Sequence, residues 1–221
     1  IIVGGSGLYI QAALYNYNFA ESRRDEAFTT KLQSIIDSDG IDPLYQRLKQ
    51  IDPEQAEHIH PNNHRRVIRA LEIYEVTGKT MTELKAEQSQ EALYDPIFIG
   101  LEMDRPILYK RINDRVDQML KDGLLEEVRD LYNQGLKDAQ AMKGIGYKEF
   151  IPYFEGWQSL DRSIELLKRN SRRFAKRQYT WFKNKLDINW YTIHPDTVKD
   201  DYQIILNHLA GILKQRVELD T

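Results

Sequence analysis

Residues 162–185 read RSIELLKRNSRRFAKRQYTWFKNK, and this stretch differs in charge from the rest of the chain. Nine Lys and Arg side chains stand against a single acid, Glu165, which leaves a net charge of +8, whereas the whole chain of 221 residues carries −3. The positive charge is therefore concentrated in one segment of an otherwise acidic protein. Five of the nine cations are Arg, whose planar guanidinium binds phosphate through two parallel hydrogen bonds.

The same stretch has the spacing of an amphipathic helix, with cations on one side and mostly apolar residues on the other. The apolar side comprises Ile164, Leu167, Phe174, Ala175, Gln178, Trp181 and Phe182, and the cationic side comprises Arg169, Arg172, Arg173 and Lys176. Like charges at i, i+4 repel by about a few tenths of a kcal/mol per pair. A polyanionic ligand is the favoured explanation for such a face, and a merely solvated basic face is the alternative.

Composition limits the class of protein. With 41% hydrophobic residues, the chain can bury a sizeable core as one domain plus an insertion. It contains no cysteine, which excludes disulfides and thiolate metal sites and fits a reducing compartment. We see no signal peptide and no apolar run long enough to span a bilayer, so we expect a soluble, cytoplasmic protein. The apolar start, Ile1-Ile2-Val3, is typical of the interior of a longer polypeptide.

The N-terminal segment predicts a strand, a turn and a helix. Residues 1–3 are apolar, residues 4–7 read GGSG, and residues 8–15 have helical spacing. A strand that leads through a glycine turn into a helix forms a crevice at the carboxyl edge of a parallel sheet, where backbone N–H groups face a ligand. We expect Ser6 to lie in this crevice; the alternative is that Ser6 only caps the helix.

Residues 20–90 are polar and predict helices without strands. Helices are expected over residues 25–36, 42–49 and 53–58, separated by Gly40 and Pro43. A further helix, capped by Asn62 or Asn63, is expected to end near Gly78.

Three arginines, Arg65, Arg66 and Arg69, occupy the first two turns of that last helix, where the helix dipole disfavours cations. Their placement predicts either an external anion or ion pairs with Glu72 or Glu75. The nearby histidines at positions 58, 60 and 64 are spaced through a Pro-containing turn, which does not present a tetrahedral ligand set, so we predict no metal site there.

Residues 95–103 predict the next strand, and residues 104–122 predict a helix with Pro106 in its first turn. On this helix Leu108, Ile112 and Met119 form an apolar stripe, and Arg115 lies within it. Burying an unpaired guanidinium costs several kcal/mol, so either an internal carboxylate or a bound anion is expected to meet Arg115.

The remaining segments predict a helix over residues 124–132, a Gly-rich loop opening a helix near residues 142–149, a last strand at 188–191 and a terminal helix over 201–214. The loop carries lysines and a tyrosine that can contact phosphates and bases. Its alternative role is a plain connection between helices.

Seven motifs occur in one order along the chain: GGSGLYI (4–10), HPNNHRRVIRALE (60–72), TGKTMTEL (77–84), RINDRVDQML (111–120), GLLEEV (123–128), GIGYKE (144–149) and SRRFAKRQYTWF (171–182). Together they resemble the tRNA dimethylallyltransferases, also called isopentenyl-tRNA transferases. The resemblance implies a predominantly helical α/β fold, with a P-loop-NTPase-like parallel sheet core at residues 1–20 and 92–221. An inserted all-helical domain at residues 21–91 would bind tRNA.

The activity that the resemblance implies is transfer of a dimethylallyl group from dimethylallyl diphosphate to N6 of the adenosine 3′-adjacent to the anticodon. By match, Arg115 binds the diphosphate, and Ser6 stands in place of a usual threonine at the mouth of the reaction channel, near the target nucleotide. The residues matched to tRNA contacts are Ser6, Arg65, Arg66, Arg69, Gly144, Gly146, Tyr147, Lys148, Arg172, Arg173, Lys176, Arg177 and Gln178.

The resemblance also implies Mg²⁺, held in part by an N-terminal P-loop, and an aspartate that acts as base toward N6. We expect both to come from residues upstream of Ile1, and we predict that this chain alone does not turn over. The expected partners are the tRNA anticodon stem-loop and dimethylallyl diphosphate, with no membrane and a monomeric protein. The alternatives are an adenylate isopentenyltransferase, a non-catalytic RNA-binding module and a nucleotide kinase.

Overall fold

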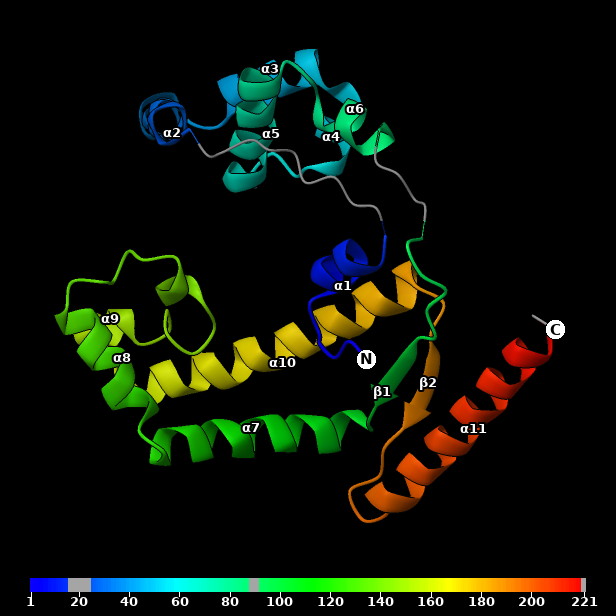
Figure 1. Ribbon diagram of the computed structural model, residues 1–221. Helices are drawn as coiled ribbons and strands as arrows, with labels where there is room; N and C mark the ends of the chain where they lie inside the picture. The colour runs from blue at the N-terminus through cyan, green and yellow to red at the C-terminus, as the bar shows by residue number, and fades with distance from the viewer. Residues whose placement is uncertain (16–24, 88–91, 220–221) are drawn as a thin grey trace. The chain divides into compact units, whose positions relative to one another are not determined.

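The computed structural model describes residues 1–15, 25–87 and 92–219, and these residues are predominantly helical. The chain forms two compact units, each with its own hydrophobic core (Figure 1). The first unit comprises residues 1–4 and 8–95, and the second comprises residues 5–7 and 96–221. Within the described ranges, no helix is both long and apolar enough to cross a bilayer.

The first unit is built from short helices whose ends are set by local capping. Its helices are α1 (Gly7–Leu14, which starts in the second unit), α2 (Glu26–Asp39), α3 (Asp42–Ile51), α4 (Pro53–His58), α5 (His64–Thr77) and α6 (Met81–Ala86). Asp25 caps α2 by accepting the Phe28 N–H, and Asn63 caps α5 by accepting the Arg66 N–H. Each cap satisfies a backbone donor that the first turn of a helix leaves free.

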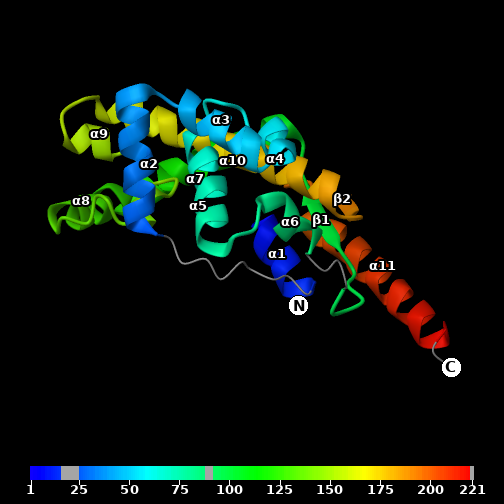
Figure 2. The same ribbon diagram turned by 90° about the horizontal axis from the view of Figure 1, so that it is seen from above.

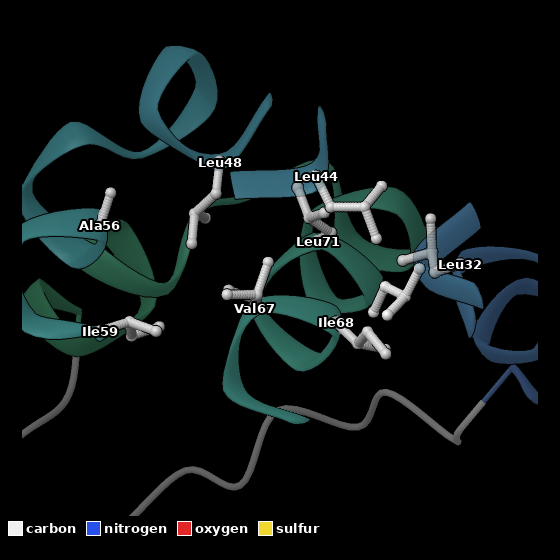
Figure 3. Close-up of a cluster of buried hydrophobic side chains, with 10 residues drawn as sticks. Leu32, Leu44, Leu48, Ala56, Ile59, Val67, Ile68 and Leu71 are labelled. Atoms are coloured by element: carbon white, nitrogen blue, oxygen red, sulfur yellow. The ribbon is translucent and has the colours of Figure 1, made fainter. Parts of the chain in front are cut away.

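Leucine, isoleucine and valine side chains of α2, α3 and α5 pack together to form the core of this unit. Figure 3 shows Leu32, Leu44, Val67 and Leu71 among them. A buried carboxylate, Asp52, caps α4 and also accepts hydrogen bonds from the Thr82 N–H (3.1 Å) and hydroxyl (2.6 Å). This carboxylate therefore joins α4 to α6.

The second unit contains the two strands found among the described residues. Strands β1 (Ile99–Glu102) and β2 (Asn189–Thr192) pair in parallel, with Gly100 opposite Trp190. Its helices are α7 (Arg105–Lys121), α8 (Leu124–Asn133), the 3-10 turn η1 (Ala141–Lys143), α9 (Ile151–Phe154), α10 (Leu160–Lys185) and α11 (Val198–Leu219). Parallel pairing requires a long crossover, and α7 through α10 provide it.

Helices α7 and α10 run side by side, and α8 and α9 lie at the end of this pair that is farther from the strands (Figures 1 and 2). The core between these elements contains Val116, Val128, Met142, Phe150 and Leu167. The first third of α10, through Leu160, Ile164 and Leu167, is thereby held in the core of its own unit.

Most of the predicted elements are confirmed, but the strand expected at residues 1–3 is wrong. Ile1, Ile2 and Val3 are exposed and have no regular structure. A strand needs a neighbour for its backbone N–H and C=O groups. In the described part of the chain, β1 and β2 pair with each other and neither pairs with residues 1–3.

Candidate nucleic-acid interface

Helix α10 is the basic helix expected from the sequence, and it runs for 26 residues without interruption. Its start is set by Ser159, whose side chain accepts the Arg162 N–H. Ser163 and Leu167 are buried on the side that packs into the second unit. Because this side is occupied, the cations on the rest of the helix divide into those that contact neighbouring elements and those that face solvent.

Two cations of α10 contact α7 rather than solvent. Lys168 forms an ion pair with Asp117 (2.5 Å), and the Arg172 Nη1 donates to the Asn113 Oδ1 (2.6 Å). The Arg172 guanidinium also lies over the Tyr109 ring, 5.9 Å from its centroid. The spacing of four residues on both helices, 113 and 117 against 168 and 172, matches this antiparallel pairing.

The predicted cationic face of α10 is therefore only partly right. Arg169 and Arg172 were expected on that face, but both are half-buried, and the Nε of Arg169 is buried without a hydrogen-bond partner in the described part of the chain. Phe174 was expected on the apolar side but is 43% exposed, with Arg177 over its ring. A helical wheel gives the angle of each residue but not the width of the neighbouring helix that covers it.

Three exposed cations of α10 lie within five residues of one another, and we call them the 173–177 cluster: Arg173, Lys176 and Arg177. None of these three forms an ion pair with another residue of the described part. Three unpaired cations within five residues repel one another, and a polyanion removes that repulsion. The cluster is thus a suitable binding surface for a phosphate backbone.

The Gly-rich loop at residues 144–149 packs against the first half of α10. The Asn170 side chain donates to the Glu149 carboxylate (2.8 Å), while Lys148 is exposed. The Tyr147 hydroxyl donates to the Glu127 carboxylate, and this hydrogen bond, followed by burial, raises the pKa of Tyr147 above its ordinary value. Gly146 is buried and has φ of +105°, a conformation that favours glycine.

Ser6 lies beside the second half of α10, not at the edge of the sheet. The Gln178 side chain donates to the Gly5 carbonyl oxygen (2.9 Å), and Gly7 lies against the Trp181 ring so closely that a Cβ at position 7 would be 2.2 Å from the ring. These two contacts hold the Gly5–Gly7 turn, and the Ser6 side chain between them is exposed. The predicted sheet-edge crevice is absent from the described residues because residues 1–3 form no strand there.

Arg115 is exposed on α7, which overturns the prediction that it lies on the buried stripe of this helix. The buried residue at this level is Val116, which packs in the core of the second unit. The side of α7 that faces α10 therefore runs through Asn113, Val116 and Asp117. Arg115 forms no ion pair with a carboxylate in the described part, so its guanidinium is available to an anion from outside.

The three arginines of α5 belong to the first unit and differ in their surroundings. Arg69 forms an ion pair with Glu72 (2.7 Å), which is the alternative that the sequence left open. Glu75 instead pairs with Arg47 (3.1 Å). Arg65 and Arg66 are exposed in the first turn. Of the three arginines, these two are therefore the better placed to bind an external anion.

Sequence reasoning missed the residues that hold the basic helix in place. The Tyr179 hydroxyl accepts the Met103 N–H (3.2 Å), and burial raises the pKa of Tyr179. Lys183 pairs with Glu102 (2.8 Å) and lies 5.0 Å from the centre of the Trp190 ring. These contacts join α10 to both strands. Their partners are far apart in sequence, so no local pattern could have revealed them.

Across residues 1–15, 25–87 and 92–219, no group of three or more His, Cys, Asp and Glu side chains is arranged to hold a metal ion. The Mg²⁺ that the resemblance implies is expected at residues upstream of Ile1, so this finding does not test that expectation.

Comparison with known proteins gives the family context for this surface. The sequence profile of the family described as "IPP transferase" matches residues 1–185. A protein of Oceanobacillus iheyensis named tRNA dimethylallyltransferase is 56% identical over 216 residues, which is 98% of this chain and 69% of that protein.

Two solved structures agree with the sequence match. The full-length tRNA isopentenylpyrophosphate transferase of Bacillus halodurans is 42% identical, with a TM-score of 0.60 over 97% of this chain and 66% of that one. A eukaryotic dimethylallyltransferase captured acting on tRNA is 33% identical, with a TM-score of 0.65 over 87% of this chain and 50% of that one. The predicted fold class is confirmed by these neighbours, and the chain spans about two thirds of the length of its bacterial relatives.

Proposed function

Because the chain belongs to the IPP transferase family, we propose that the protein transfers a dimethylallyl group from dimethylallyl diphosphate to tRNA. The acceptor is N6 of the adenosine 3′-adjacent to the anticodon. The allylic carbon–oxygen bond breaks, the new bond forms between that carbon and N6, a proton leaves N6, and diphosphate is the leaving group. The adenosine must leave its stack to reach the electrophile, as in other enzymes that act on a base.

The observation that carries this proposal is the 173–177 cluster on α10. Arg173, Lys176 and Arg177 are exposed and have no ion-pair partner in the described part of the chain. An extended polyanion such as an anticodon stem-loop is the ligand that uses such a group, because each phosphate contact releases a counterion. A free adenine nucleotide needs no such extended surface.

Arg115 is proposed to bind the diphosphate. Its exposed guanidinium is unpaired within the described ranges, and a guanidinium can hold two phosphate oxygens at once. Developing negative charge on the leaving group is stabilised by such a contact more strongly than the ground state is. Ser6, held between the Gln178 and Trp181 contacts, is proposed to lie near the target nucleotide.

Residues 21–91 are proposed to form a helical insertion that adds contacts to the same RNA. The described residues that flank it lie together, since Tyr15 and Ala92 form an isolated antiparallel bridge and the Leu93 N–H donates to the Leu14 carbonyl (2.9 Å). A chain that leaves and returns at one point is typical of an inserted domain. Arg65 and Arg66 are its proposed phosphate contacts.

The remaining proposals rest on the family likeness alone. We propose a monomeric and cytoplasmic protein. Light scattering of the purified protein, with and without a stem-loop, measures the oligomeric state. Mg²⁺ is proposed to be held by residues other than the described ones, among which no group of three or more His, Cys, Asp and Glu side chains is arranged to hold a metal ion.

The test is a transfer assay with the full-length protein, labelled dimethylallyl diphosphate and an anticodon stem-loop. Replacement of Arg115 by Ala is expected to lower the transfer rate by about 100-fold, the typical effect of losing one donor to developing charge, with stem-loop binding unchanged. Arg111→Ala is the matched control, because Arg111 is also exposed on α7, one turn earlier. Normal turnover by Arg115→Ala, or an equal loss in Arg111→Ala, would show that Arg115 does not bind the diphosphate.

Two further arms of this assay separate the alternatives. Transfer to free adenosine monophosphate but not to the stem-loop would identify an adenylate isopentenyltransferase. The chain of 221 residues is assayed beside the full-length protein, and it is expected to bind the stem-loop without turnover, because the P-loop and base aspartate of the family have no match in its sequence. Binding without transfer by the full-length protein would indicate a non-catalytic RNA-binding module.

A further inference from the structure

Glu149, the last residue of the Gly-rich loop, is a buried acid with unusual partners. Its side chain is only 4% exposed. In the described part of the chain it forms no ion pair with any Lys, Arg or His side chain. Burial of a carboxylate without a counter-charge is costly unless hydrogen bonds compensate it. The hydrogen bonds that the Glu149 carboxylate accepts must therefore stabilise it, and their donors show which elements it connects.

The two carboxylate oxygens join two different elements. One, Oε2, accepts the backbone N–H of Gly146 inside the loop (2.9 Å). The other, Oε1, accepts the Asn170 Nδ2 on α10 (2.8 Å). The carboxylate therefore forms a bridge from the loop backbone to the basic helix.

Further hydrogen bonds surround the bridge. The Gln158 side chain donates to the Glu149 carbonyl oxygen (2.9 Å) and to the Ser163 hydroxyl (2.7 Å), which fixes the backbone of Glu149 to the start of α10. Gly146 has φ of +105°, and in this conformation its N–H donates to the carboxylate. Loss of the carboxylate would release the loop while leaving the Gln158 contacts in place.

The bridge connects an exposed lysine of the loop to the exposed cations of α10. Lys148 lies next to Glu149 in the loop, and Arg173 lies three residues after Asn170 on α10. A polyanion with regularly spaced phosphates is bound best when its cationic partners are held at a constant separation, because ordering them on binding costs affinity. We propose that Glu149 is a positioning residue, which holds the 144–148 loop in register with the 173–177 cluster so that both bind one RNA backbone together.

This inference rests on the proposed function, and it is tested by exchanging the two partners. Gly146 and Asn170 donate to different oxygens of Glu149, and in Glu149→Gln one of these positions becomes an NH₂ group, so the hydrogen bond accepted there is lost. In the double variant Glu149→Gln with Asn170→Asp, the oxygen of this amide accepts from Gly146, and its NH₂ group donates to the new carboxylate at position 170. The double variant thus keeps the charge of the pair and restores both hydrogen bonds.

The measurement is the affinity of the full-length protein for an anticodon stem-loop, with thermal unfolding recorded for each variant. Glu149→Gln is expected to weaken binding by about tenfold, the effect of losing one charge-assisted hydrogen bond, and the double variant is expected to return to within about twofold of wild type. If Glu149→Gln does not fold, Asn170→Ala, which keeps the Gly146 contact, is expected to weaken binding by about threefold while it remains folded.

Three outcomes would overturn the inference. The first is a lower melting temperature for Glu149→Gln with unchanged RNA affinity, which would make the role purely structural. The second is a double variant that binds as weakly as Glu149→Gln. The third is Asn170→Ala that binds like wild type. Failure of the proposed function has a different signature, since wild-type protein would then not bind the stem-loop at all.

Discussion

Neutralising the 173–177 cluster tests how the protein holds RNA. The perturbation is the triple variant Arg173→Gln, Lys176→Gln and Arg177→Gln. All three side chains are exposed and form no ion pair within the described part, so their removal leaves no buried charge unpaired. The fold is therefore expected to remain intact, and the change in binding can be assigned to lost phosphate contacts.

The magnitude follows from counterion release. Each phosphate contact contributes about 0.7 to 0.9 to the slope of log affinity against log salt, so three contacts lower the slope by about 2 to 3. Between about 50 and about 200 mM salt, the ratio of the two affinities, wild type to triple variant, is then expected to shrink by roughly 25-fold. A helix that carried only a solvated basic face would give no such change in slope.

The assay is a salt titration of stem-loop binding by fluorescence anisotropy, with a control triple of equal charge change. The control replaces three exposed lysines of other helices by Gln: Lys110 on α7, and Lys199 and Lys214 on α11. Lys110 and Lys214 each form an i, i+4 ion pair with an acid. The control is expected to keep the wild-type slope. An unchanged slope in the cluster variant, or the same loss of slope in both triples, would refute the assignment of the RNA surface to α10.

Three further predictions concern stability. In Gly7→Ala the new Cβ would lie 2.2 Å from the Trp181 ring, so we expect urea titration to show a loss of about 1 to 3 kcal/mol in the free energy of unfolding. Gly4→Ala is the control, because no atom lies within 4 Å of the new Cβ, and it should unfold like wild type. Glu72→Ala removes a 2% exposed carboxylate that accepts hydrogen bonds from the Asp25 N–H and from Arg69, and we expect the free energy of unfolding to fall by about 2 to 4 kcal/mol. Glu75→Ala breaks only the exposed pair with Arg47, and we expect a loss of less than about 1 kcal/mol. Equal losses in the two variants would contradict this prediction. The backbone hydrogen bond from the His194 N–H lowers the pKa of Asp201 below 3.8. Its contribution to stability is therefore complete above about pH 4 and is lost as the pH falls through the lowered pKa. In Asp201→Asn the free energy of unfolding should fall less steeply at acid pH than in wild type, and an identical pH dependence in both proteins would argue against the contact.

The helices were predictable because their ends depend on neighbouring residues in the chain. Helix α4 covers residues 53–58 as predicted, and α5 begins after Asn63 and ends before Gly78, which adopts the left-handed conformation. Capping side chains, Pro and Gly act over about one turn, so their effect can be read from a short window. The basic helix was predictable for the same reason.

The errors concern residues whose environment depends on a distant partner. Arg115 was placed on a buried stripe, but the side of α7 that packs against α10 runs through Asn113, Val116 and Asp117. Residues 1–3 have strand-like composition, yet a strand forms only where a second strand offers its backbone. Periodicity gives relative angles around a helix, and it leaves open which angle faces the neighbour.

Sequence alone therefore determined the local helices, the concentration of positive charge in residues 162–185, and the family resemblance that the comparisons confirm. The tertiary structure decided which of those charges are used internally: Lys168 and Arg172 bind α7, whereas Arg173, Lys176 and Arg177 remain exposed. It alone revealed that the buried Glu149 joins the Gly-rich loop to α10. The reason is physical, because charge and helix propensity belong to a residue and its near neighbours, while burial and pairing depend on segments that only folding brings together.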